Sequence, residues 1–188
     1  MSVQRGDTMI DYLHVSIAQQ RIYAFSGQQL QRTYTVSTAL NGPGEENGSG
    51  CTPRGRHYIR AKIGGQLPAM AVLRGRRWTG EIWTPERHQA YPGRDWILSR
   101  ILWLSGCELG RNRLGSTDTF RRYIYIHGTA DEALLGQPYS HGCIRMANQD
   151  LIELYAQLGD ACPVEISEHT TQEQILQAAT KEYSCTAH

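Results

Sequence analysis

The chain has 188 residues, of which 40% are hydrophobic and 20% are charged. This length and composition favour one globular domain with a sizeable core and exclude a disordered chain. Nineteen Lys and Arg against eighteen Asp and Glu give a net charge of +1, which provides no case for a nucleic-acid binder. We expect a single domain over residues 1–188, with its core at about 9–167 and a C-terminal helix and tail at 168–188.

The N-terminal residues 1–8 are polar, and the alternating segment after them contains Asp11 and His14. No secretory signal or membrane span is recognisable, which predicts a cytoplasmic protein without a membrane partner. If an export signal had been removed, the location would be periplasmic. The five cysteines are widely spaced and odd in number, so they form a poor disulfide framework and fit a reducing compartment.

Three segments near the N-terminus alternate between apolar and polar residues, which is the period of half-buried strands. These segments are 9–17, 21–25 and 31–37, with Gly27 at a hairpin turn between the second and the third. The glycine-rich stretch 41–50 is predicted as a surface loop, because it lacks the strand and helix context of a phosphate-binding loop. Residues 51–55 then turn into a strand over 56–63.

The middle of the chain, 64–115, is rich in Arg and contains all four tryptophans. Only 95–104 is predicted as regular structure. We favour a strand there, although the spacing of its aromatic and polar residues also suits a short helix. The rest is either the wall of a substrate groove, since long loops are often functional, or a solvated insertion with core tryptophans.

Residues 120–127 are predicted as a strand with Tyr123, Tyr125 and His127 on one face, and Tyr125 is a candidate substrate contact. The segment 128–139 is a connector. A helix is expected from an N-cap at Asn148 to about Leu158. A strand at 162–166 and a helix at 171–180, introduced by capping-box spacing in 170–173, complete the chain.

The segment Ser140-His141-Gly142-Cys143-Ile144-Arg145, with His127-Gly128 upstream, contains the parts of a cysteine acyl-transfer site. A thiol needs a base to become a nucleophile, and the oxyanion that it creates needs backbone N–H donors. Cys143 is therefore the predicted nucleophile, assisted by the N-terminal dipole of the helix that follows. A structural cysteine is the alternative, and it is the default interpretation of the other four.

Two histidines compete for the role of the base. His141 lies two residues from Cys143, and residues so close in a turn rarely face one another, so His127 from a separate strand end is favoured. These three residues also suit zinc, but no fourth ligand or general-base Glu is evident, and no metal is predicted. Arg145 either binds a substrate carboxylate or flanks the helix at the surface, and Ser140 either orients His141 or closes the turn.

These residues resemble the motif of the L,D-transpeptidase (YkuD) family, in which a His-Gly pair and a spacer precede Ser/Thr-His-Gly-Cys, an apolar residue and Arg or Asn. The turn Thr52-Pro53-Arg54-Gly55 and the pair Ser37-Thr38 match as well, and the similarity spans about 9–167. The resemblance implies a mostly β barrel or sandwich, with short helices after the turn that carries the cysteine.

The resemblance also implies a role for each site residue. Cys143 is the nucleophile, and His127 accepts and donates the proton, oriented by the carbonyl of Gly128. The amides of His141, Gly142 and Cys143 form the oxyanion hole, while Arg145 and His141 contact the donor peptide. No cofactor and no metal are implied.

The implied substrate is a peptidoglycan stem tetrapeptide (a muropeptide), cleaved through a thioester between its third residue and the terminal D-Ala. The third residue is either meso-diaminopimelate or Lys. Because no export signal is recognisable, we predict a cytoplasmic L,D-carboxypeptidase of murein recycling, in which water releases a tripeptide. The alternatives are an L,D-transpeptidase with an amine or D-amino acid acceptor, and a catalytically silent muropeptide sensor.

Overall fold

A ten-stranded sheet organises the protein, and the computed structural model describes residues 8–178 of it. The strands are β1 Tyr12–Ser16, β2 Arg21–Ser26, β3 Gln29–Ser37, β4 Gly55–Ile63, β5 Ala71–Arg74, β6 Arg77–Ile82, β7 Ile97–Gly106, β8 Tyr125–Gly128, β9 Ile144–Met146 and β10 Pro163–Ser167. The helices are α1 Pro85–Ala90, α2 Asn148–Gln157 and α3 Gln172–Ala178, with 3₁₀ turns η1 at Gly115–Thr117 and η2 at Glu132–Leu134.

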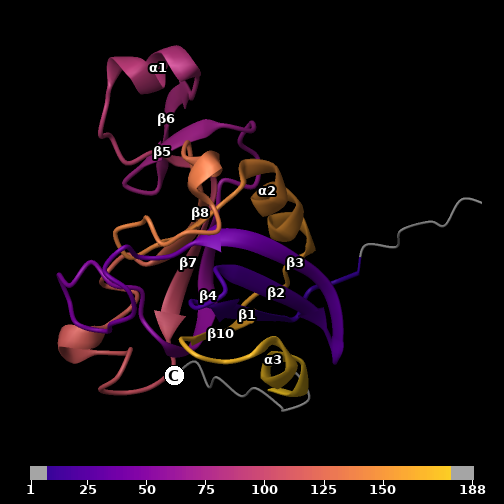
Figure 1. Ribbon diagram of the computed structural model, residues 1–188. Helices are drawn as coiled ribbons and strands as arrows, with labels where there is room; N and C mark the ends of the chain where they lie inside the picture. Colours follow the sequence, from indigo (N-terminus) through magenta and orange to yellow (C-terminus); the bar gives the residue numbers. More distant parts are fainter. Residues whose placement is uncertain (1–7, 179–188) are drawn as a thin grey trace, which may run out of the picture.

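The sheet closes on itself into a barrel. Its order is β4-β10-β1-β2-β3-β9-β8-β7-β5-β6, and a second pairing of β4 with β7 joins the two ends of the first eight strands. The hairpin β5–β6 and the short α1 extend beyond this ring, at the top of Figure 1. The mostly β fold predicted from the sequence is confirmed.

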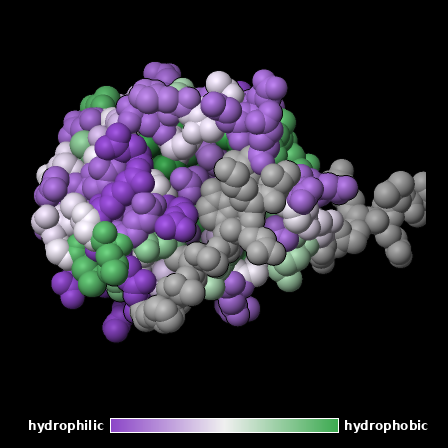
Figure 2. Space-filling view, turned by 90° about the horizontal axis from the view of Figure 1, so that it is seen from below, coloured by the Kyte–Doolittle hydropathy of each residue, from purple (hydrophilic) through white to green (hydrophobic). Residues whose placement is uncertain are grey.

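The core fills the barrel with the side chains that point inward from alternate positions along each strand. Its fully buried members include Leu13, Ile22, Leu102, Ile126 and Ile144. Helix α2 covers one end of this core with the buried Leu151 and Leu154, and packs against β7 and β8. On the face seen from below, hydrophilic residues predominate and hydrophobic ones form small separate groups (Figure 2). Within residues 8–178, no helix is long and apolar enough to cross a membrane.

Strand β8 is shorter than predicted. It begins at Tyr125, because Tyr123 has a φ of +57°, a left-handed conformation that no extended strand contains. The Asp118 carboxylate accepts the N–H groups of Leu114 and Arg121 and thereby folds the segment before it into a turn. Tyr123 is consequently 52% exposed and does not lie on a strand face with Tyr125 and His127.

The middle segment is more regular than predicted. The strand expected at 95–104 is confirmed as β7, whereas β5, β6 and α1 were not foreseen. The N-cap of α2 is Ala147, and Asn148 is the first helical residue, so its prediction as the N-cap is wrong. The N-cap of α3 is Thr171, whose hydroxyl and N–H exchange hydrogen bonds with Gln174, one residue later than the predicted capping box. The predicted end of this helix lies outside the described residues.

One cysteine departs from the expectation that the five form a poor disulfide framework. Cys51, Cys143 and Cys162 are free, but Cys107 is disulfide-bonded. The expectation that the cysteines form no disulfide is therefore wrong for Cys107.

Two buried histidines make the fold sensitive to acid. His14 hydrogen-bonds Tyr12 and Ser167, and His57 hydrogen-bonds the carbonyl of Gly55 and the hydroxyl of Thr119. Burial is the main cause that lowers the pKa of each imidazole to about 4. Because the unfolded chain binds these protons near pH 6.5, the stabilisation is complete above that pH and is lost as the pH falls toward 4.

We therefore expect the free energy of unfolding to fall by roughly 2 kcal/mol per histidine between pH 7 and pH 5. Urea unfolding at the two pH values measures this change, and His57→Gln should remove its own share of it. A free energy that is constant between pH 7 and pH 5 would show that the two imidazoles accept protons equally well in the folded chain.

Candidate active site

Two adjacent parallel strands bring the motif residues together. Strands β8 and β9 pair with Ile126 opposite Ile144 and His127 opposite Arg145. The two isoleucines are fully buried in the barrel core. Because side chains alternate along a strand, His127 and Arg145 lie on the other face, as does Cys143, one residue before Ile144. The structure thus places His127 and Cys143 on one face of the β8–β9 pair, two residues out of register.

His127 is 1% exposed, and its Nδ1 lies 2.8 Å from the carbonyl oxygen of Gly128. A carbonyl only accepts hydrogen bonds, so Nδ1 carries the proton and Nε2 keeps its lone pair. Burial is the largest influence and lowers the pKa of His127. Asp95 and the Gly128 carbonyl oppose it, and Arg145 adds to it. The imidazole is therefore neutral at pH 7, as a proton acceptor must be.

The Cys143 thiol is held by the backbone just before and within β8. Its Sγ donates to the Tyr123 carbonyl and accepts from the N–H of Tyr125, both at 3.3 Å. Burial raises the pKa of Cys143 to about 12, although the hydrogen bond from the N–H of Tyr125 acts in the opposite direction and lowers it. Helix α2 does not begin at the cysteine, because β9 lies between them, so the predicted help from its dipole is wrong. Thiol and imidazole are both neutral at rest.

This protonation state predicts how the thiol reacts with iodoacetamide. We expect the rate at Cys143 to rise about tenfold per pH unit from pH 7 to pH 10, because the thiolate is the reactive form and stays a minor species. The rate is measured by mass spectrometry of the peptide that contains Cys143, with Cys51 as an internal comparison. A thiolate–imidazolium pair would instead give a rate that is already at its plateau at pH 7.

Ser140 closes the turn that presents the cysteine. Its buried hydroxyl accepts from the N–H of Gly142 at 3.2 Å and donates to the carbonyl of Cys143. Gly142 has a φ of +130°, where any residue with a side chain is strained. Of the three amides that the resemblance assigns to the oxyanion hole, that of Gly142 therefore already has a partner. His141 is exposed on the outside of the turn.

Arg145 does not lie at the surface, since it is only 4% exposed. Its two terminal nitrogens contact Asp95 at 2.8 Å and Asp131 at 3.4 Å, and its Nε has no hydrogen-bond partner among the described residues. The alternative interpretation of Arg145, as a helix-flanking surface residue, is therefore wrong, and substrate binding stays a prediction. Two carboxylates already compensate the charge that was expected to bind a substrate carboxylate.

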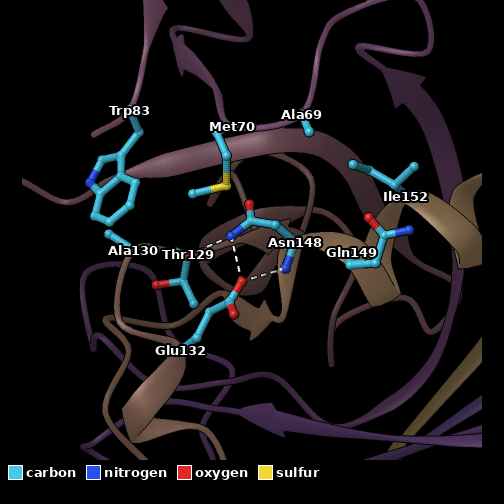
Figure 3. A pocket seen from close by; sticks show the side chains of 9 residues that line it. All are labelled: Ala69, Met70, Trp83, Thr129, Ala130, Glu132, Asn148, Gln149 and Ile152. Atoms are coloured by element: carbon cyan, nitrogen blue, oxygen red, sulfur yellow. Dashed lines mark hydrogen bonds between the residues drawn. The ribbon is translucent and has the colours of Figure 1, made fainter. Parts of the chain in front are cut away.

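Asn148 fixes the segment after His127, a role that the sequence did not reveal. Its Nδ2 donates to the Thr129 carbonyl and to Glu132 (Figure 3). Its Oδ1 accepts from the Ser99 hydroxyl. A Cβ on Gly128 would lie 2.2 Å from this Oδ1, so only glycine allows the approach. Asn148, Thr129 and Glu132 line a cavity of about 390 Å³, together with Met70 and Trp83 from either end of the β5–β6 hairpin. The glycine after His127 was the available signal.

Arg122 is a second residue that was missed. Its guanidinium donates to the carbonyls of Gly44, Glu45 and Cys51 and to the hydroxyl of Ser49. It thereby holds the glycine-rich loop 41–50 beside the turn that contains His141. Residues of this loop, Arg122 and His141 together line a cavity of about 310 Å³. No three His, Cys, Asp or Glu side chains of residues 8–178 are grouped so as to hold a metal ion.

The family model described as YkuD, L,D-transpeptidase catalytic domain, matches residues 10–166, nearly the whole barrel. The chain belongs to this family. The resemblance noted from the motif is thereby confirmed.

Solved L,D-transpeptidases share the fold. One from Xylanimonas cellulosilytica is 16% identical with a TM-score of 0.51, covering 89% of this chain and 64% of its own. The C442S mutant of the Enterococcus faecium L,D-transpeptidase is 12% identical with a TM-score of 0.51, covering 84% of this chain and 50% of its own. The chain thus spans less than two thirds of the length of either. No curated protein sequence matches it.

Proposed function

We propose that the protein is a cysteine acyl-transfer enzyme that cleaves the L,D bond before the terminal D-Ala of peptidoglycan stem tetrapeptides. One observation carries the proposal: the Cys143 thiol and the His127 imidazole share one face of the β8–β9 pair, and Nε2 of this imidazole has no hydrogen-bond partner among residues 8–178. Membership of the L,D-transpeptidase family supports the substrate class.

In the proposed reaction, the thiol of Cys143 first turns its S–H from the carbonyl of Tyr123 to Nε2 of His127, which becomes its hydrogen-bond acceptor. As Sγ bonds to the carbonyl carbon of the third residue, the proton passes to Nε2, because neither group is charged beforehand. The amides of Cys143 and His141 stabilise the oxyanion. The carbon–nitrogen bond then breaks as the oxyanion returns to a carbonyl, and His127 gives the proton to the leaving amine. D-Ala departs, and the tripeptide stays bound to Sγ of Cys143 as a thioester.

We propose that water then releases the tripeptide, which makes the protein an L,D-carboxypeptidase. Water needs no binding surface of its own, whereas an amine acceptor needs a second peptide subsite. Release by an amine or a D-amino acid is L,D-transpeptidation, and it passes through the same thioester. A place in cytoplasmic murein recycling stays a prediction, and the disulfide at Cys107 favours an oxidising compartment instead.

Mass spectrometry of a disaccharide tetrapeptide incubated with the protein tests these steps. Formation of the tripeptide in plain buffer supports hydrolysis. If excess D-amino acid gave more exchange product than tripeptide, the protein would be an L,D-transpeptidase and not a carboxypeptidase. Binding without loss of D-Ala would mean that the protein is a muropeptide sensor.

A further inference from the structure

Arg76 occupies an unusual place at the tip of the β5–β6 hairpin. Because Arg74 pairs with Arg77, Gly75 and Arg76 form a two-residue turn, with φ of +55° and +65°. Such turns favour Gly or Asn, and a left-handed conformation costs other residues about 1–2 kcal/mol. Contacts outside the hairpin must therefore hold an arginine at this position.

Those contacts form a stack of rings and guanidinium groups. The Arg76 guanidinium carbon lies 4.6 Å from the centre of the Trp103 ring and 5.0 Å from that of Tyr123, and its Nη1 donates to the Tyr125 hydroxyl at 3.2 Å. Trp103 stacks on Phe120 at 3.9 Å, and Arg60 lies 4.4 Å from the Phe120 ring. Arg76 and Arg60 cover the two ends of this stack, so neither ring has an outer face left to bind a ligand. The stack therefore serves to hold Arg76 in place.

The charge of Arg76 is uncompensated. Among the described residues, no carboxylate lies within ion-pair distance of it, whereas Arg145 has both Asp95 and Asp131. Guanidinium groups match carboxylates with two parallel hydrogen bonds, and stacking leaves the N–H edges available for this. Arg122, the third guanidinium near the thiol, already donates from both terminal nitrogens to three carbonyls and a hydroxyl. The cation near the thiol whose N–H edge can receive a substrate carboxylate is therefore Arg76.

The distance from the thiol indicates which carboxylate fits. The N–H of Tyr125 contacts Sγ of Cys143 while its hydroxyl contacts Arg76, and the carbonyl of Tyr123 contacts Sγ while its ring lies beneath Arg76. The cation is thus about one tyrosine side chain away from the attacked carbonyl. The carboxylate of the leaving D-Ala is much closer to that carbonyl, whereas the end of a long third side chain spans the gap.

We propose that Arg76 recognises a carboxylate at the end of the third residue's side chain, as in meso-diaminopimelate, and disfavours the bare ammonium of Lys. This assignment rests on the proposed function, because it takes Cys143 as the attacking atom. Arg76 is a specificity-determining residue and takes no part in proton transfer.

The test compares three tetrapeptides that carry meso-diaminopimelate, its side-chain carboxamide, or Lys. For the natural chain we expect kcat/KM to favour the free carboxylate by about tenfold or more, which is typical of a charge-assisted pair. Arg76→Gln should bring the carboxylate and carboxamide substrates to within about threefold through KM, and Arg76→Lys should restore part of the preference. Arg77→Gln removes the same charge from the same hairpin and should leave the preference unchanged.

Each outcome separates this assignment from the proposed function. A ratio of the two kcat/KM values that is unchanged by Arg76→Gln, or changed equally by Arg77→Gln, would overturn the role of Arg76 and leave the enzyme intact. If amidating the D-Ala carboxylate of the substrate, and not the third-residue carboxylate, removed the effect of Arg76→Gln on kcat/KM, Arg76 would bind the leaving residue. That result would overturn the third-residue assignment. Charge-dependent binding to the natural chain without turnover would retain Arg76 and reject the enzyme. Neither binding nor turnover would reject both.

Discussion

Replacing Cys143 with Ala is expected to lower turnover of the tetrapeptide by at least about 10⁴-fold, because no thioester can form without Sγ. The loss should not come from unfolding. The thiol is only partly buried, and its removal leaves the carbonyl of the exposed Tyr123 and the N–H of the buried Tyr125 without this partner, at a cost of about 1–2 kcal/mol. Turnover is measured as released D-Ala, and folding by urea unfolding of the same samples.

Cys51→Ala is the matched control for this substitution. Cys51 is also a free and partly buried thiol, and its Sγ donates to the carbonyls of Asn41 and Ser49. Its replacement should leave turnover within about threefold, since it holds neither the base nor the oxyanion. If Cys143→Ala unfolded the protein, Cys143 would be a core residue. If it still released D-Ala, the nucleophile would lie elsewhere.

Replacing His127 with Gln should lower kcat by about 10²–10⁴-fold, the usual contribution of a general base. The reason is the protonation state of the site: burial raises the pKa of the thiol to about 12 and lowers that of His127, so a neutral acceptor has to take the proton during attack. In the natural chain, kcat/KM should accordingly decrease only below pH 6.5, as His127 becomes protonated, and should not decrease from pH 7 to pH 9.

His141→Gln distinguishes the two candidate bases. His141 is exposed on the turn, while His127 has its Nδ1 fixed by the Gly128 carbonyl. We expect the His141 variant to change kcat by less than about tenfold, through its contact with the donor peptide. A larger loss for His141→Gln than for His127→Gln would transfer the role of base to His141.

The sequence predicted the parts of the fold that depend on local patterns. Alternating residues identified β1 to β3, turn signals and residue types identified β4, β7 and β10, and the motif identified the residues that β8 and β9 place on one face. All of these signals are local, so a single sequence contains them. The family motif added the order of the site residues along the chain.

The parts that the sequence did not reveal depend on distant contacts. The turn at Tyr123 depends on hydrogen bonds to Asp118, and the Asn148 side chain joins Ser99, Thr129 and Glu132. The charge of Arg145 is compensated by Asp95, fifty residues away. None of these partners leaves a periodic pattern, because each is set by how the barrel closes. This is also why Arg76 could not be recognised before the hairpin was placed beside Tyr125.

The central claim is that Cys143 carries the acyl group during turnover, and acid quenching of the reaction followed by intact-mass and peptide analysis tests it directly. The proposed function predicts an adduct equal to the tetrapeptide without its D-Ala on the peptide that contains Cys143. The adduct should form together with the first equivalent of free D-Ala and be absent from Cys143→Ala. Release of D-Ala with no adduct, at the same rate in Cys143→Ala, would contradict it.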